Sequence, residues 1–168
     1  IGKSTLQTLV TAQQCPVDGA HAHPSQGLLD MFTIREQGKS LKGLKMAIIG
    51  DILYSRVART NIAAWNKMGA EVHVAGPMTL LPHDIEALGV TVHKHVEDAI
   101  ADADVVDILR IQLERQKKGL FPTTREYARI FGINEKRLAL AKPDVTDRIK
   151  RNSSELQHII VCFYVDRV

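Results

Sequence analysis

The chain has 168 residues, of which 45% are hydrophobic and 24% are charged, and its formal net charge is +3. These values are typical of one globular domain with its own core, and they exclude two full domains. Basic and acidic residues are interspersed along the chain, which argues against a nucleic-acid partner. Small anionic ligands remain compatible with the mild positive charge.

The sequence has no apolar run of the roughly 18–20 residues that a membrane span requires, and no signal-peptide pattern. Cys15 and Cys162 are far apart and lack the spacing of a metal site, which favours a reducing compartment over a disulfide framework. We therefore expect a cytoplasmic protein with no membrane partner. Because the chain begins at Ile1 rather than Met, we also expect it to be a fragment.

Hydrophobic periodicity and helix-ending glycines predict alternating helices and strands. In chain order, the pattern predicts a helix over residues 24–38, a strand over 45–50, a helix over 56–68 and a strand over 71–76. A short helix over 82–88 leads to a strand over 90–93, a helix over 96–101 and a strand over 104–111. Short helices follow over 125–131 and 135–140, and the tail is compatible with one more helix and strand.

Strands that alternate with helices indicate a parallel sheet, because each crossover helix returns the chain to the same end of the sheet. The helices that alternate with the strands should cover both faces of this sheet. The predicted fold class is therefore α/β, with three layers and a mostly parallel, Rossmann-like sheet that carries helices on both faces.

In an open parallel sheet, ligands bind beyond the carboxyl ends of the strands. The first strand ends at Gly50, and the further glycines of a dinucleotide-binding loop are absent, which argues against a nicotinamide cofactor. Ser55 and Arg56 stand instead at the start of the next helix, where free N–H groups and the helix dipole favour an anion. An arginine at such a position suits a carboxylate.

The fourth strand ends near Arg110 and Gln112, which are two residues apart and therefore point the same way along an extended segment. Two arginines at two strand ends suit a ligand with two carboxylates. The alternative is that Arg56, Arg110 and Arg115 are surface residues in weak ion pairs.

Histidines at positions 21 and 23 suggest a metal, but no cysteine or carboxylate completes a ligand set. His23 and Gln26 lie three residues apart at a helix start and could reach one polar ligand, with His23 donating to an oxygen that becomes negative. His93 and His95 are expected to be solvated edge residues. Asp107 interrupts an apolar strand, so it must either have a partner or weaken that strand.

Three motifs carry a resemblance to a known family. They are His23-Pro-Ser-Gln26-Gly-Leu-Leu-Asp30, Ser55-Arg56-Val-Ala-Arg59 after Gly50-Asp51, and Arg110-Ile-Gln112-Leu-Glu114-Arg115. In order and spacing, from about Asp18 to Asp144, the chain resembles the catalytic chain of the aspartate carbamoyltransferase family. The second and third motifs distinguish it from ornithine carbamoyltransferases, which share the histidine-proline-x-glutamine element.

The resemblance implies transfer of a carbamoyl group from carbamoyl phosphate to L-aspartate, in pyrimidine biosynthesis, without a cofactor or a metal. It assigns His23 to the carbamoyl oxygen and Gln26 to the carbamoyl amide. Arg56 and Arg110 would bind the two carboxylates of aspartate, and Gln112 would lie near its amine. The same resemblance implies supporting roles for Ser55, Glu114 and Arg115, and assembly into homotrimers.

The resemblance also divides the chain into parts. Residues 1–17 are divergent, 18–38 form a bridging helix, 39–144 form the aspartate-binding domain, and 145–168 are a divergent tail. The family's phosphate-binding segment has no counterpart in this sequence, so we expect an aspartate half-site with weak or absent turnover by the chain alone. The alternative is a non-catalytic relative that binds dicarboxylates.

Overall fold

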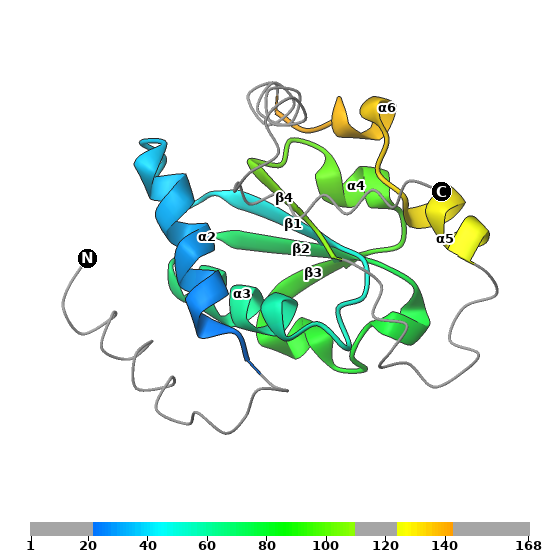
Figure 1. Cartoon of the computed structure of the whole chain (residues 1–168), viewed down its shortest axis with the longest axis horizontal. Helices are drawn as coiled ribbons and strands as arrows, with labels where there is room; N and C mark the ends of the chain where they lie inside the picture. The colour runs from blue at the N-terminus through cyan, green and yellow to red at the C-terminus, as the bar shows by residue number, and fades with distance from the viewer. Residues whose placement is uncertain (1–21, 110–123, 143–168) are drawn as a thin grey trace.

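A computed structural model describes residues 22–109 and 124–142 (Figure 1). Four parallel strands form one sheet in the order β3-β2-β1-β4. The strands are β1 (Lys45–Ile49), β2 (Glu71–Ala75), β3 (Val90–His93) and β4 (Val105–Ile108). The helices are α2 (Pro24–Glu36), α3 (Arg56–Lys67), α4 (Val96–Ile100), α5 (Thr124–Phe131) and α6 (Glu135–Leu138). The predicted α/β class and parallel sheet are confirmed.

Residues at the ends of the two longest helices explain where these helices begin and end. In α2, Pro24 occupies the first turn, where its missing N–H costs no hydrogen bond, and Gly38 follows the helix with φ of 73°. In α3, the Oγ of Ser55 accepts a hydrogen bond from the Ala58 N–H, and Gly69 follows with φ of 79°. Glycine adopts this left-handed conformation without the steric cost that a Cβ imposes.

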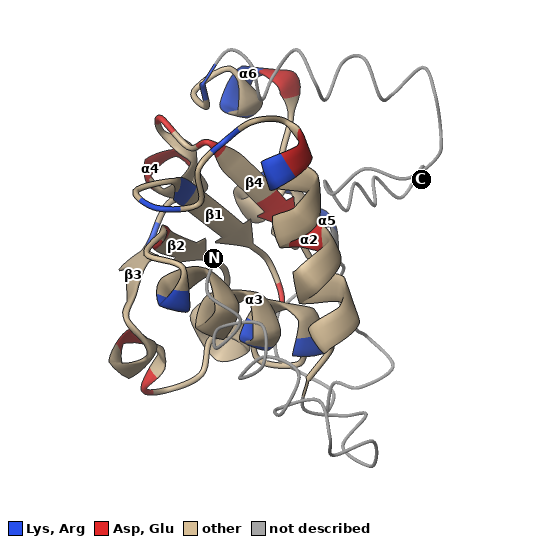
Figure 2. Cartoon of the chain, turned by 90° about the vertical axis from the view of Figure 1, so that its left-hand side faces the viewer, with Lys and Arg blue, Asp and Glu red and all other residues tan. Residues whose placement is uncertain are grey.

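The sheet has an apolar core on each face, and Figure 2 shows α2 and α4 on opposite sides of it. Alternate strand residues such as Met46 and Ile48 pack with α2 and α3 on one face. The intervening residues Ala47 and Ile49 pack with α4 and α6 on the other. Burial on both faces explains why the buried strand positions are apolar, with Asp107 as the exception.

Two predicted elements differ from the structure. The short helix predicted over residues 82–88 is present only as a 3-10 turn, η2 (Ile85–Leu88), and a second 3-10 turn, η1 (Met78–Leu80), precedes it. Their hydrogen bonds span three residues, as between the Gly89 N–H and the Glu86 carbonyl. Strand β4 ends at Ile108, earlier than predicted. The predicted tail elements lie outside the described residues, and no described helix is long and apolar enough to cross a membrane.

Helices α2 and α3 approach closely at Gly27 on the α2/α3 face of the sheet. A Cβ at this position would lie 2.8 Å from Thr60 Cγ2 and 3.2 Å from Asn61 Oδ1. Both neighbours belong to α3, so only glycine allows this separation of the two helices. The contact sets where the N-terminal end of α2 lies relative to that of α3.

We predict that Gly27→Ala destabilises the protein by about 1–2 kcal/mol, because overpacking outweighs the gain of roughly 0.8–1 kcal/mol that alanine normally brings to a helix. Urea unfolding measures the change. Glu36→Ala, at an exposed position in the last turn of α2, is the control and should stay within about 0.5 kcal/mol of the parent. Equal stability of Gly27→Ala and the parent would show that the helices can separate freely.

Candidate functional site

The strand order reverses between β1 and β4, which are neighbours although β2 and β3 lie between them in the sequence. The Leu109 N–H donates to the Ile49 carbonyl over 2.8 Å, so the carboxyl ends of these two strands meet. Such a switch point is where open α/β sheets bind their ligands. The segment from Gly50 to Arg56 follows β1 at this point, and Arg110 follows Leu109 in the sequence.

Ser55 and Arg56 lie at the N-terminus of α3, as predicted. Ser55 is buried, and its Oγ caps the helix, so its contribution is to the start of α3 and hence to the placement of Arg56. Arg56 is half-buried at the first helical position. A guanidinium there adds to the positive potential of the helix N-terminus, which favours an anionic ligand.

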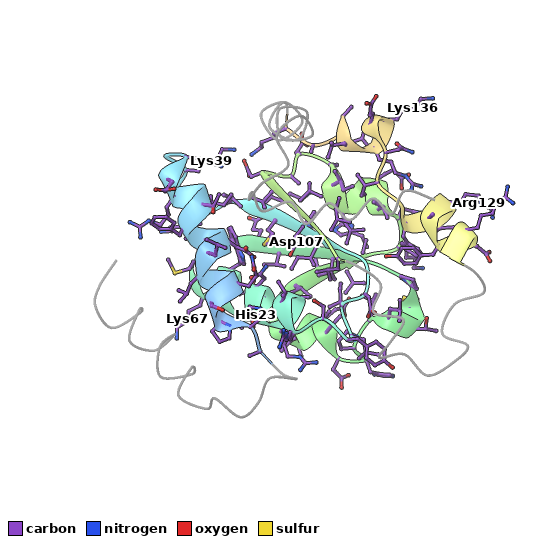
Figure 3. All side chains as sticks on the ribbon, in the orientation of Figure 1. His23, Lys39, Lys67, Asp107, Arg129 and Lys136 are labelled. Atoms are coloured by element: carbon purple, nitrogen blue, oxygen red, sulfur yellow. The ribbon has the colours of Figure 1, made fainter. Side chains whose placement is uncertain are left out.

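His23 is the N-cap of α2 (Figure 3). Its Nδ1 accepts from the Gln26 backbone N–H over 3.3 Å and lies 3.2 Å from Ser25 Oγ. Because a backbone N–H can only donate, Nδ1 must be unprotonated, and the neutral ring carries its proton on Nε2. The local helix cap thus leaves an Nε2–H donor, which is what stabilisation of a carbonyl oxygen requires.

Thr60 connects the starts of the two helices. Its Oγ1 accepts from the His23 backbone N–H over 2.9 Å and donates to the Arg56 carbonyl over 3.0 Å. One side chain therefore holds the backbones of His23 and Arg56 together, although they are far apart in the sequence. Nothing in the sequence pattern singles out Thr60, since it occupies an ordinary helical position.

Gln26 is positioned by a carboxylate one helical turn further along α2. Its Nε2 donates to Asp30 Oδ1 over 2.7 Å, and the two residues are four apart, a spacing that places them on the same side of a helix. Asp30 is 1% exposed and also accepts from Asn61 of α3 over 2.8 Å. Burial raises the pKa of Asp30, while the hydrogen bonds from Asn61 and Gln26 oppose that rise.

Asp107 of β4 has a partner. The Asn61 Nδ2 donates to Asp107 Oδ2 over 3.2 Å. Of the two alternatives that the sequence left open for this buried carboxyl group, the structure therefore shows a hydrogen-bond partner. Burial, followed by repulsion from Asp30, raises the pKa of Asp107 to about 7. Asn61 was missed in the sequence because 46 residues separate it from Asp107, and only the fold brings the two together.

Helix α5 approaches the carboxyl end of β1. A Cβ at Gly50, where φ is 125°, would lie 2.8 Å from the Leu109 carbonyl oxygen and 3.1 Å from the Tyr127 hydroxyl. Burial, and then the nearby Asp51, raise the pKa of Tyr127 above its ordinary value, so this hydroxyl stays protonated. Sequence reasoning did not identify Tyr127, which stands in a short amphipathic helix without a motif.

The expectation for His93 is wrong. His93 is half-buried, and its Nε2 lies 2.8 Å from Nδ1 of His73 on the adjacent strand, with the two rings stacked. Burial, and then the charge of Lys45, lower the pKa of both rings. The register of β2 and β3 creates this pair, which no local pattern reveals. His95 is exposed, as expected.

Four of the predicted site residues lie outside the described residues: Arg110, Gln112, Glu114 and Arg115. Their roles therefore stay predictions. Within 22–109 and 124–142, no group of three or more histidine, cysteine or acidic side chains could hold a metal ion.

A family model described as the Asp/Orn binding domain of aspartate/ornithine carbamoyltransferase matches residues 42–146. The chain belongs to the aspartate/ornithine carbamoyltransferase family. Among the solved carbamoyltransferases, it is similar to an aspartate transcarbamoylase from Trypanosoma cruzi in complex with carbamoyl phosphate. The TM-score is 0.62 at 27% identity, covering 74% of this chain and 43% of that one.

Relatives in sequence agree. The aspartate carbamoyltransferase catalytic subunits of Ruminiclostridium cellulolyticum and Desulforamulus reducens are 67% and 63% identical over 127 residues. In both cases the match covers 76% of this chain and 41% of the relative. The chain thus spans less than half the length of the carbamoyltransferase subunits that it matches.

We predict that Thr60→Val destabilises this carbamoyltransferase domain by about 1–2 kcal/mol, because the His23 N–H loses its acceptor. The 15N signals of the His23 ring should also shift, since its N-cap position is no longer held against α3. Thr33→Val is the matched control, because the Thr33 hydroxyl donates to the Leu29 carbonyl of its own helix and, within the described part of the chain, does not connect α2 to α3. Unchanged His23 signals in Thr60→Val would contradict the positioning role of Thr60.

Proposed function

We propose that the protein represented by this chain is an aspartate carbamoyltransferase and that the chain supplies its aspartate half-site. The observation that carries the proposal is the Thr60 link, which joins the backbones of His23 and Arg56, the residues proposed to contact the carbamoyl oxygen and a carboxylate. The names of relatives at 63% and 67% identity support aspartate as the acceptor. The proposed parts are a bridging helix over 18–38 and an aspartate-binding domain over 39–144, flanked by the divergent segments 1–17 and 145–168.

The proposed reaction is direct attack of the aspartate amine on the carbonyl carbon of carbamoyl phosphate. The new C–N bond forms, the C–O bond to phosphate breaks, and the proton that the amine loses passes to the departing phosphate. Negative charge that develops on the carbonyl oxygen would be met by the Nε2–H of His23. Gln26 would contact the carbamoyl amide. Rate then comes from orientation and charge stabilisation, and neither a covalent intermediate nor a cofactor is needed.

The proposed acceptor site uses Arg56 and Arg110 for the two carboxylates and Gln112 for the amine. Arg56 is half-buried at a helix N-terminus, which strengthens an ion pair relative to a fully solvated one. Ser55 would act through the helix start, and Glu114 and Arg115 would support the neighbouring segment.

The proposed setting is the cytoplasm, in agreement with the cysteine usage of the sequence. A trimer, as the resemblance implies, is a separate proposal. Sedimentation of the purified chain tests it directly, since a single monomeric species at micromolar concentration would contradict it.

We predict that calorimetry detects binding of L-aspartate and succinate to this chain, and that Arg56→Ala weakens it at least about tenfold, because a carboxylate partner is lost. Arg129→Ala, in the exposed part of α5, is the control and should leave binding unchanged (Figure 3). If neither dicarboxylate binds, or if both arginine variants behave alike, Arg56 is not a carboxylate ligand. Arg110→Ala tests the second arginine in the same way.

We predict weak or absent formation of carbamoyl-aspartate by the pure chain, because its sequence lacks the family's phosphate-binding motif. A bisubstrate phosphonate should bind no more tightly than succinate for the same reason. Ordinary turnover by the pure chain would overturn this prediction. Dicarboxylate binding that never supports turnover, even with an intact carbamoyl-phosphate-binding domain added, would favour the non-catalytic relative instead.

A further inference from the structure

Three polar side chains are buried together between α2, α3 and β4. Asp30, Asn61 and Asp107 are 1%, 0% and 2% exposed, and each belongs to a different element. Figure 3 shows Asp107 on the sheet beside α2, while His23 lies at the start of that helix. Two carboxyl groups in an apolar core are costly unless their hydrogen bonds and charges are balanced.

One acceptor of this cluster has no hydrogen-bond donor among the described residues. The Asn61 Nδ2 has two protons, and it donates to Asp30 Oδ2 over 2.8 Å and to Asp107 Oδ2 over 3.2 Å. Asp30 Oδ1 accepts from Gln26 Nε2, so each Asp30 oxygen has a donor. In contrast, Asn61 Oδ1 is buried and has no partner among the described residues. A buried acceptor of this kind requires an explanation.

A proton on Asp107 would supply the missing donor. A carboxylic acid and a primary amide can form a ring of two hydrogen bonds, in which the amide N–H meets the carbonyl and the acid O–H meets the amide oxygen. One bond of such a ring, from Asn61 Nδ2 to Asp107 Oδ2, is present, and the partnerless Asn61 Oδ1 belongs to the same amide.

The two acids are not equivalent. Burial and the neighbouring Asp30 raise the pKa of Asp107 to about 7, whereas hydrogen bonds from Asn61 and Gln26 favour Asp30 as the charged member. Two ionised carboxylates that share one donor in a core repel each other, so ionising both costs free energy. Among the described residues, the pair is contacted by the neutral amides of Gln26 and Asn61, and apolar Ile48 is the β1 register partner of Asp107.

We propose that Asp107 is protonated and donates to Asn61 Oδ1, so that the one negative charge of the pair rests on Asp30 and holds Gln26. An ionised Asp30 can only accept, which fixes Gln26 with Nε2 inward and leaves Oε1 for a donor such as the amide of a carbamoyl group. Asp30, Asn61 and Asp107 are then positioning residues. Only the contact of Oε1 with a ligand rests on the proposed function.

The arrangement depends on pH with a definite sign. Folded Asp107 keeps its proton up to about pH 7, whereas an unfolded aspartate loses it near 3.8. Between these values the folded state binds more protons, so the contribution of Asp107 to stability falls as pH rises and is lost above about pH 7. Loss of that proton also places a second charge beside Asp30, which disturbs the hydrogen bond to Gln26.

The first test is NMR of the whole chain, with carboxyl 13C signals of aspartate and side-chain 15N signals of glutamine followed from about pH 5 to pH 8.5. Asp107→Asn and Gln26→Asn assign the signals. The expected result is one buried aspartate with a midpoint near 7, absent in Asp107→Asn, and a Gln26 amide signal that moves with the same midpoint. An Asp107 midpoint near 4, or a Gln26 signal that does not follow it, would overturn the proposal.

The second test compares variants by thermal unfolding and by the Gln26 signal. In Asp107→Asn, the new amide can replace both hydrogen bonds of the ring without titrating, so the Gln26 signal at about pH 8 should keep its low-pH position. The Tm of this variant relative to the parent should rise by at least about 5 °C from pH 4.5 to pH 8. Asp107→Leu also removes the second charge, so its Gln26 signal should not titrate near pH 7, but it lacks a donor to Asn61 Oδ1 and should have a lower Tm than Asp107→Asn.

Asp104→Asn is the matched control, because Asp104 directly precedes β4 but its carboxylate pairs with Lys142 and accepts from the Lys45 backbone N–H rather than from Asn61. It should leave the midpoint of the Gln26 signal unchanged, and an equal effect of Asp104→Asn and Asp107→Asn would contradict a specific role for Asp107. None of these measurements uses a ligand. Failure of dicarboxylate binding would therefore contradict the proposed function but not this inference. An Asp107 midpoint near 4 would contradict this inference but not the proposed function.

Discussion

The side-chain amide of Asn61 connects the three elements on which the candidate site depends. It donates to Asp30 of α2 and to Asp107 of β4 from the middle of α3, in a region where water cannot substitute for a lost bond. Apolar contacts press both helices onto the sheet, but hydrophobic burial is non-directional and tolerates sliding. Hydrogen bonds in a core do not tolerate it, so the amide sets the position of each helix along the sheet.

The positions of the two helices determine where the candidate site residues lie. Asp30 holds Gln26, the close approach at Gly27 brings Thr60 near, and Thr60 joins His23 to Arg56. The groups that would meet carbamoyl and carboxylate are therefore placed by a core arrangement, with the helix caps of His23 and Ser55 defining the local direction. Asp107 lies beneath α2, in the core, and a change in its protonation would reach Gln26 through Asn61 and Asp30.

Much of the fold was predictable because its signals are local. Apolar runs identified β1 to β4, and Gly38 and Gly69 marked the ends of α2 and α3 to within two residues. The region over 82–88 was misjudged because 3-10 turns and short helices share the same composition. His93 was misjudged because its partner His73 is a neighbour only through the register of two strands. The roles of Arg110, Gln112, Glu114 and Arg115 stay predictions.

The sequence by itself determined most of the elements, the α/β class and the family, and it marked His23, Gln26, Ser55 and Arg56 as candidate site residues, because caps, periodicity and motifs depend on residues close along the chain. The tertiary structure decided which strands are neighbours, that Thr60 joins two helix starts, and that Asp107 has a partner. The physical reason is distance along the chain. Asn61 meets side chains 31 and 46 residues away, and only the packing of α2 and α3 on one parallel sheet brings those groups within hydrogen-bonding distance.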